Sequence, residues 1–319
     1  MKKLVVIILF TLLFLPAKQL NSWGFHAHKL INRYAVFTMP EELIGFFKKH
    51  IDYLTEHSVD ADKRRYAVKE EAPRHYIDID VYGKNPFEVM PRKWNDAVEK
   101  FTEDTLVTYG IVPWHIQTIY NRLVKAFSDK DVEYILRNAS DLGHYVADTH
   151  VPLHTSLNYN GQLTGQKGIH AFWESRLPEL FSDNYDFLVG TANYRYSVLD
   201  VAWETVEQSH AALDSVLDFD KQLSQTYEQD KQYSYEKRGQ KTIKVRSEEF
   251  SAAYHEKLNG MVEKRLRKSV KTIGDLWYSA WVDAGQPILD GMQESENPFV
   301  EEIILDHRIT KEGARGHQH

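Results

Sequence analysis

Apolar residues in this chain recur at the three- and four-residue spacing of α-helices over much of its length. In residues 43–54 they fall on one helical face, and the helix is expected to open at Pro40 because proline suits the first turn. The same pattern continues in four further stretches, residues 113–127, 131–151, 196–219 and 247–284. The last is long enough to be broken at Gly260 or Gly274. Strand-like alternation is confined to residues 74–80, so we expect an all-α fold, one mostly helical domain with little β structure.

The N-terminus has the pattern of a secretory signal peptide. Lys2 and Lys3 precede an unbroken apolar run over residues 4–16, and a short polar stretch ends at Ser22. The apolar run is shorter than the roughly 20 residues that a membrane-spanning helix needs. We therefore expect cleavage after Ser22, export to a periplasm or to the medium, and no transmembrane segment in the cleaved chain.

The remaining chain divides into a main domain and two polar segments. The helical pattern places the domain at residues 23–306, followed by a flexible tail at 307–319. Residues 221–248 are rich in Lys, Gln, Glu and Tyr and are expected to form a solvated excursion from the domain. We find no internal repeat and no Pro- or Ser-rich linker.

Cysteine is absent from all 319 residues, which excludes disulfides and thiolate chemistry. Any metal site must therefore use His, Asp, Glu or backbone atoms. The 39 basic and 46 acidic residues leave a net charge of −7. This negative net charge argues against nonspecific electrostatic binding of nucleic acid over the whole protein surface. It is compatible with a local basic groove.

Histidine and carboxylate residues are spaced as metal ligands in the middle of the chain. His144 and Asp148 are four residues apart on an expected helix and so share one face. His170 and Glu174 repeat that spacing, and His154 lies between the two pairs, just after a helix-ending proline. One such pair alone is more often a surface or core pair, but two pairs with a third histidine between them indicate a metal site. Imidazole and carboxylate without thiolate suit zinc at an open, catalytic site.

Three further segments fit the same site. Residues 60–65 offer carboxylates beside arginines, and His75 lies on the strand-like stretch. Taken singly, these would be a solvated loop and a core histidine. Cleavage after Ser22 would leave Trp23 as the first residue, with a free α-amino group that can bind metal once it loses its proton, and His28 follows five residues later.

The complete pattern resembles a known superfamily. It consists of an N-terminal Trp with a following His, then Asp, then His, then His-x-x-x-Asp-x5-His, then His-x-x-x-Asp/Glu, and it spans residues 23–174. In this order and spacing it is similar to the trinuclear-zinc superfamily, which joins bacterial zinc-dependent phospholipase C with the single-strand-specific zinc nucleases. The resemblance implies a helical domain with a cleft that holds three zinc ions.

The resemblance also implies which residues hold each ion. One zinc would be held by Asp62, His75, His144 and Asp148. A second would be held by His154, His170 and Glu174. The third would be held by the amino group and carbonyl of Trp23 and by His28, with Asp148 bridging it to the first.

The segment around Asp62 departs from the pattern of the nucleases. They commonly have Trp-Ala-Asp-x-x-Arg, whereas this chain has Asp-Ala-Asp-Lys-Arg-Arg at residues 60–65. Asp60 and Asp62 are therefore alternative ligands, and Arg65, three residues after Asp62, favours Asp62. The resemblance implies that Asp62 would orient a zinc-bound hydroxide and accept its proton. Arg65 would stabilise charge on the phosphoryl group during hydrolysis of a phosphodiester.

Several features bear on which phosphodiester is the substrate. Single-stranded nucleic acid is favoured by the close spacing of Trp23 and His28, by Arg65, by Trp173 just before the acidic ligand, and by Tyr76, which is placed to stack on a base. A phospholipid head group is favoured by glutamate as the last ligand, by the short loop between His154 and His170, and by the absence of cysteine. We therefore predict a nuclease, with phospholipase C as the first alternative and a non-catalytic zinc-binding protein as the second. No stable protein partner is predicted.

Overall fold

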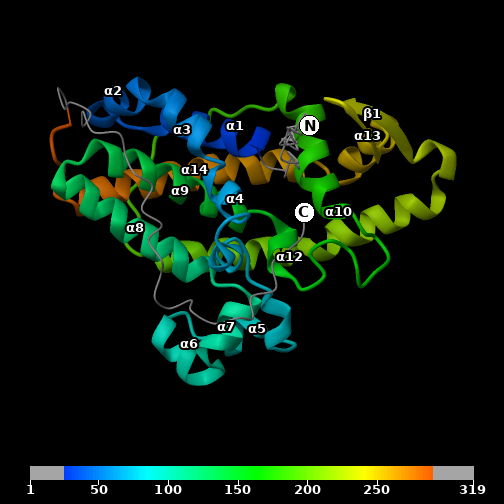
Figure 1. Cartoon of the computed structure of the whole chain (residues 1–319), viewed down its shortest axis with the longest axis horizontal. Helices are drawn as coiled ribbons and strands as arrows, with labels where there is room; N and C mark the ends of the chain where they lie inside the picture. Colours follow the sequence, from blue (N-terminus) through cyan, green and yellow to red (C-terminus); the bar gives the residue numbers. More distant parts are fainter. Residues whose placement is uncertain (1–24, 290–319) are drawn as a thin grey trace, which may run out of the picture.

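The computed structural model describes residues 25–289. Within that range the chain is mostly α-helical and carries one two-stranded antiparallel sheet, which confirms the predicted all-α class (Figure 1). Among these residues, none of the helices combines the length and the apolar character that crossing a bilayer requires. The predicted signal peptide, Trp23 and the predicted tail at 307–319 lie outside the described residues.

The elements follow one another along the chain with short connections. The first half contains α1 (Phe25–Ala35), η1 (Val36–Thr38), α2 (Glu41–Lys49), α3 (Ile51–His57), α4 (Asp60–Arg64), η2 (Lys69–Arg74), η3 (Ile79–Tyr82), α5 (Pro86–Val89), α6 (Trp94–Phe101), α7 (Glu103–Tyr109) and α8 (Val112–Asp129). The second half contains α9 (Val132–Thr149), η4 (Pro152–Thr155), α10 (Ile169–Ala171), the π-helical turn η5 (Phe172–Arg176), α11 (Leu177–Phe181), η6 (Ser182–Asn184), α12 (Val198–Thr226), η7 (Gln229–Lys231), β1 (Tyr233–Arg238), β2 (Lys241–Arg246), α13 (Glu248–Lys257) and α14 (Met261–Asp283).

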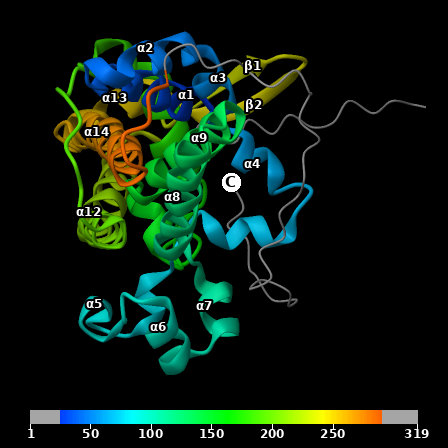
Figure 2. The ribbon, with the colours of Figure 1, turned by 90° about the vertical axis from the view of Figure 1, so that its left-hand side faces the viewer.

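The long helices α8, α9, α12 and α14 pack together with α1, while the short helices α5, α6 and α7 gather at one end (Figures 1 and 2). Lys130 ends α8 in the left-handed conformation, and the Asp131 side chain accepts a hydrogen bond from the Tyr134 backbone to begin α9. This tight turn sets α8 and α9 side by side. In the core, Trp277 of α14 stacks on Phe47 and donates a hydrogen bond to the Ala139 carbonyl of α9.

Two glycines allow helices to approach closely. A Cβ at Gly143 of α9 would lie 1.9 Å from Oδ1 of Asn32 on α1, and a Cβ at Gly274 of α14 would lie 1.9 Å from Oγ1 of Thr38. Only glycine fits at either contact. The first contact matters for function, because it holds α1 against α9 directly beside His144.

One sequence-based expectation is wrong. Residues 74–80 are not a strand: the segment links η2 to η3, and its backbone amides donate to two separate helical elements, Ile77 to the His154 carbonyl of η4 and Asp78 to the Tyr109 carbonyl of α7. Every side chain from His75 to Ile79 is buried, so the apparent alternation does not mark an exposed face.

Residues 221–248 are mostly exposed, as expected for a solvated excursion, and they form regular structure: they extend α12 to Thr226 and then form the β1–β2 hairpin. The long helix expected at 247–284 is broken at Asn259 and Gly260, which both have positive φ, whereas Gly274 lies inside α14.

Candidate metal centre

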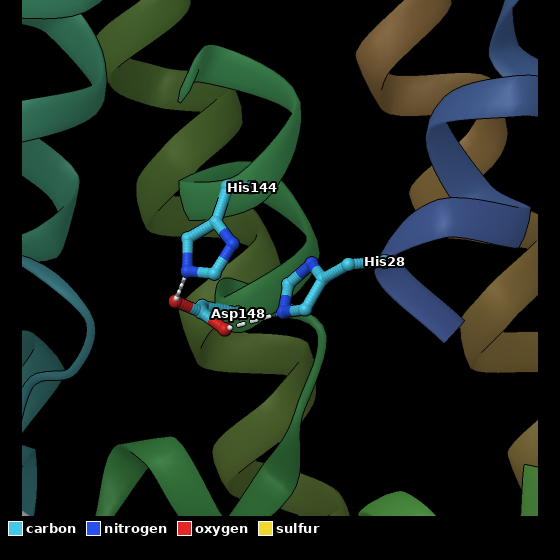
Figure 3. A group of neighbouring side chains, drawn as sticks. All are labelled: His28, His144 and Asp148. Carbon is cyan, nitrogen blue, oxygen red and sulfur yellow. Dashed lines mark ion pairs between the residues drawn. The ribbon is translucent and has the colours of Figure 1, made fainter. Parts of the chain in front are cut away.

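Helix α9 supplies the central pair of the site. His144 and Asp148 lie one turn apart on its buried face, with Nε2 of His144 3.3 Å from Oδ2 of Asp148. His28 reaches the same carboxylate from α1, with its Nε2 3.4 Å from Oδ1 (Figure 3). The rings of His28 and His144 stack with their centroids 4.0 Å apart. These three residues form the first cluster that could hold a metal ion.

The second cluster shares His144 and adds residues from the segment between α4 and η3. Nδ1 of His75 lies 3.0 Å from Nε2 of His144 and 2.9 Å from Oδ2 of Asp148. Asp62 of α4 completes the cluster, with Oδ1 3.9 Å from each of those two histidine nitrogens. All of these side chains are buried. The chain thus brings together residues that are up to 86 positions apart in its sequence.

The third cluster lies after the helix-ending Pro152. His154 of η4 and His170 of α10 place their Nε2 atoms 3.2 Å apart, and Oε1 of Glu174 lies 3.2 Å from the His154 Nε2 atom. Glu174 also pairs with His170. Glu174 sits in the π-helical turn η5, an irregularity that is frequent at functional sites. This cluster connects to the others through Asp148, whose Oδ1 is 3.7 Å from Nδ1 of His154.

Backbone carbonyls fix three of the imidazoles in one tautomer. Nδ1 of His144 donates to the Ser58 carbonyl at 2.8 Å, and Nδ1 of His154 donates to the His75 carbonyl at 2.8 Å. Nδ1 of His170 donates to the Tyr159 carbonyl at 3.1 Å. A carbonyl oxygen can only accept, so the proton of each neutral ring is on Nδ1 and the lone pair is on Nε2, which points into its cluster. Metal-ligating histidines are typically oriented in this way.

His75 has the opposite orientation. Its Nδ1 faces the cluster, and its Nε2 lies 3.6 Å from Oε1 of Glu71. Glu71 is itself buried and accepts hydrogen bonds from Arg74, at 2.6 Å, and from Tyr145. A carboxylate behind a histidine is the arrangement that raises the basicity of a metal ligand. Sequence reasoning missed Glu71, although its position four residues before His75 on a helical turn is a usable signal.

The geometry of the clusters fits zinc. Four ligands at 2.0–2.1 Å from a tetrahedral zinc ion are roughly 3.3–3.4 Å from one another. Apart from the closer pair of Glu174 and His170, the separations between ligand atoms within the clusters run from 2.9 to 3.9 Å around that value. The donor set of imidazole and carboxylate, without thiolate, also suits zinc. Three buried clusters could therefore hold metal ions, with Asp148 at the junction between them.

The pKa values show how strongly the clustered groups interact. Burial lowers the pKa of His144, but Asp148 and Asp62 outweigh it and raise the pKa to about 9. The pKa of His154 also rises to about 9, because Asp148 and Glu174 outweigh burial. Burial raises the pKa of Glu174, but His170 and His154 reverse the effect and bring it to about 2. The Glu174 carboxylate is therefore ionised at neutral pH and available as a ligand.

The remaining predicted residues fall in different places. Of the two alternative ligands, Asp62 joins the cluster, while Asp60 pairs with His57 at 2.6 Å and Lys63 at 2.7 Å. Arg65 lies beside the cluster, with Nη1 3.6 Å from Oδ1 of Asp62. Tyr76 was expected to stack on a base, but its ring is fully buried, so the structure offers a base no face of it.

A cavity of about 320 Å³ lies behind the centre, on the far side of Glu71. Arg64 lines it and links the surrounding network, with Nη2 3.0 Å from Oδ1 of Asp141 and 3.2 Å from the Tyr145 hydroxyl oxygen. These contacts support the segment that carries His75 and Asp62. Comparisons with known proteins do not extend the assignment: neither the protein-family models nor the curated proteins contain a match to this chain.

Proposed function

We propose that this protein is a zinc-dependent phosphodiester hydrolase. The observation that supports the proposal best is the convergence of eight predicted ligands, from separate parts of the chain, on three buried clusters joined at Asp148. Buried ionised carboxylates are costly unless positive charge compensates them, and zinc ions would supply that charge in place of the protons on His144 and His154. A purely structural zinc site needs only one closed cluster, whereas three neighbouring clusters suit a site that handles a charged substrate.

The proposed roles follow from the positions of the side chains. Bound zinc ions would supply a nucleophile from water at neutral pH and would offset the charge of a phosphate group. Asp62 would hold a proton at its carboxylate while it orients the attacking water. Arg65, beside Asp62, carries the planar fork of donors that matches phosphoryl oxygens, and it would bind and orient the phosphate.

Single-stranded nucleic acid is the substrate that we favour, because Arg65 lies beside Asp62 where an incoming phosphate would meet both. A phospholipid head group is the second candidate, and the glutamate ligand at 174 favours it. A non-catalytic zinc-binding role is the third candidate. We also propose that the protein works outside the cytoplasm, since its sequence begins with the pattern of a signal peptide.

One experiment separates these candidates. Zinc-loaded protein is assayed in parallel on bis(p-nitrophenyl) phosphate, single-stranded DNA, RNA and phosphatidylcholine vesicles, and its zinc content is measured by elemental analysis. We expect close to three zinc ions per chain, hydrolysis of the chromogenic diester, and cleavage of the nucleic acids. Hydrolysis of the vesicles in place of the nucleic acids would favour a phospholipase C. Zinc binding without hydrolysis of any of these substrates would favour the non-catalytic zinc-binding role.

A further inference from the structure

The β1–β2 hairpin is a strongly basic segment in an acidic chain. Residues 233–246 contain five basic side chains and one acidic side chain, whereas the whole chain has a net charge of −7. The hairpin stands out from the helices beside α13 (Figure 1). A local concentration of positive charge of this kind attracts polyanions even when the protein as a whole repels them.

The register of the hairpin places its aromatic and basic residues on one face. Tyr235 pairs with Lys244, and Lys237 pairs with Thr242, so these four side chains point to the same side of the two strands. All four are exposed, and Tyr235 is 73% exposed. Within residues 25–289 no acidic side chain pairs with Lys237 or Lys244. Lys244 lies over the Tyr233 ring, with Nζ 3.9 Å from the ring centroid, a contact that leaves its charge in place. The positive charges of the two lysines are therefore not offset by an acidic partner.

The opposite face attaches the hairpin to the π-helical turn η5 and to α11. Glu236 accepts hydrogen bonds from Arg176, and Arg238 pairs with Glu179 of α11. Arg176 also donates to the Arg246 carbonyl of β2. Because Arg176 lies two residues after Glu174 in the same π-helical turn, the hairpin is attached to the element that carries a proposed zinc ligand.

We propose that the exposed face of this hairpin, formed by Tyr235, Lys237, Thr242 and Lys244, binds a single-stranded polynucleotide next to the metal centre. The two lysines would contact phosphates, and the Tyr235 ring would stack on a base, the combination that proteins use to bind single strands without sequence preference. The inference rests on the proposed hydrolase function and adds a binding surface outside the metal clusters. A lipid surface is the less favoured partner, since a flat tyrosine ring between two lysines fits a base between two phosphates.

The test uses the zinc-loaded full chain with Tyr235→Ser, Lys237→Gln and Lys244→Gln combined. The matched control combines Tyr196→Ser, Lys84→Gln and Lys93→Gln, which removes the same residue types and charge from exposed positions on other elements. Steady-state kinetics are measured on a single-stranded dT20 oligonucleotide and on bis(p-nitrophenyl) phosphate, which has a single phosphate and no neighbouring nucleotides to contact the hairpin. Circular dichroism checks that both variants fold.

We expect the hairpin variant to raise the KM for dT20 at least about tenfold relative to the KM for the chromogenic diester, since the lost stacking alone is worth a comparable factor. The dependence of log(kcat/KM) on log salt should become shallower by about 1.4, because each phosphate contact on a single strand contributes about 0.7. The control variant should match the natural protein in both respects.

Two results would overturn the proposal. One is a hairpin variant with the natural KM and salt dependence for dT20. The other is a variant that loses binding to anionic phosphatidylglycerol vesicles while dT20 cleavage is unchanged. Failure of the natural protein to hydrolyse the chromogenic diester would count against the hydrolase function itself. This outcome can be told apart from failure of the hairpin proposal. If the protein does not cleave dT20, its binding to dT20 is measured by fluorescence anisotropy, and the natural protein and the hairpin variant are compared.

Discussion

The carboxylate of Asp148 lies between His75 and His28. Its Oδ2 is 2.9 Å from Nδ1 of His75, and its Oδ1 is 3.4 Å from Nε2 of His28. The two oxygens of one carboxylate therefore face different clusters, as a bridging ligand requires. Burial opposes its charge, yet His144 and His154 hold the pKa of Asp148 well below its ordinary value.

Replacing Asp148 should remove at least one metal ion. Asp148→Asn keeps the size of the side chain but loses the negative charge that both clusters share, so we expect zinc content to fall by at least one ion and activity to fall at least about 100-fold. Elemental analysis and the chromogenic assay measure the two effects. A variant that retains three ions would disprove the bridging role.

The two neighbouring aspartates provide a matched comparison. Asp62→Asn removes a ligand from the second cluster and should lower zinc content and activity together. Asp60→Asn removes a half-exposed partner of His57 and Lys63, a pair near the surface that contributes little to stability, so zinc content should be unchanged. The same effect in both variants would contradict the assignment of Asp62 as the ligand.

Arg65 should affect turnover without affecting metal. Arg65→Ala removes a donor to the phosphate and should lower kcat roughly 100- to 1,000-fold, the usual cost of losing one such donor. Zinc content should stay the same, because an arginine is not a ligand. Arg65→Lys should recover only part of the rate, since it lacks the planar fork. Full turnover in Arg65→Ala would exclude a role in binding the phosphate.

Helical periodicity and ligand spacing gave the most reliable predictions from the sequence. A spacing of four residues put His144 beside Asp148 and His170 beside Glu174, because a helix fixes that geometry locally. The sequence could not show that Gly143 packs against Asn32. This contact holds α1 against α9 and so brings His28 next to His144 and Asp148. It also could not show that Tyr76 is buried, since that depends on contacts between distant segments, whereas the spacing of Glu71 and His75 was a local signal that could have been used.

The hairpin was missed for a different reason. Charged and polar residues surround its few apolar ones, Ile243 and Val245 among them, so the alternation along each strand was hidden within a charged composition. The signal that could have located it is Gly239 between the two runs, which adopts a positive φ at the turn. Conversely, the alternation at 74–80 was misleading, because His75 and its neighbours are buried on all sides.

The metal-free protein should lose stability as pH rises through the alkaline range. The pKa values of His144 and His154, about 9, are above their ordinary value of 6.5, so protonation stabilises the folded state. This contribution is fully present below pH 6.5 and is lost as pH rises through 9. Urea unfolding with a chelator at pH 6 and pH 9 should show the decrease, and zinc-loaded protein should show little of it. Equal free energies of unfolding for the chelated protein at pH 6 and pH 9 would contradict the raised pKa values of His144 and His154.

Activity should also depend on cleavage after Ser22. Trp23 can donate its nitrogen to zinc only when it is the first residue, because the lone pair of an amide nitrogen is delocalised into the carbonyl group. A free α-amino group has a pKa near 8 and can lose its proton when zinc competes for it. A chain that begins with an additional methionine before Trp23 should therefore bind about one zinc ion fewer and turn over more slowly than a chain whose N-terminus is confirmed as Trp23 by mass spectrometry. In the extended chain the third zinc ion would be held by His28 with fewer other ligands. Calorimetry should therefore show a lower affinity for the weakest of the three zinc-binding steps. Equal zinc content and equal rates in the two chains would show that the N-terminus is not a ligand.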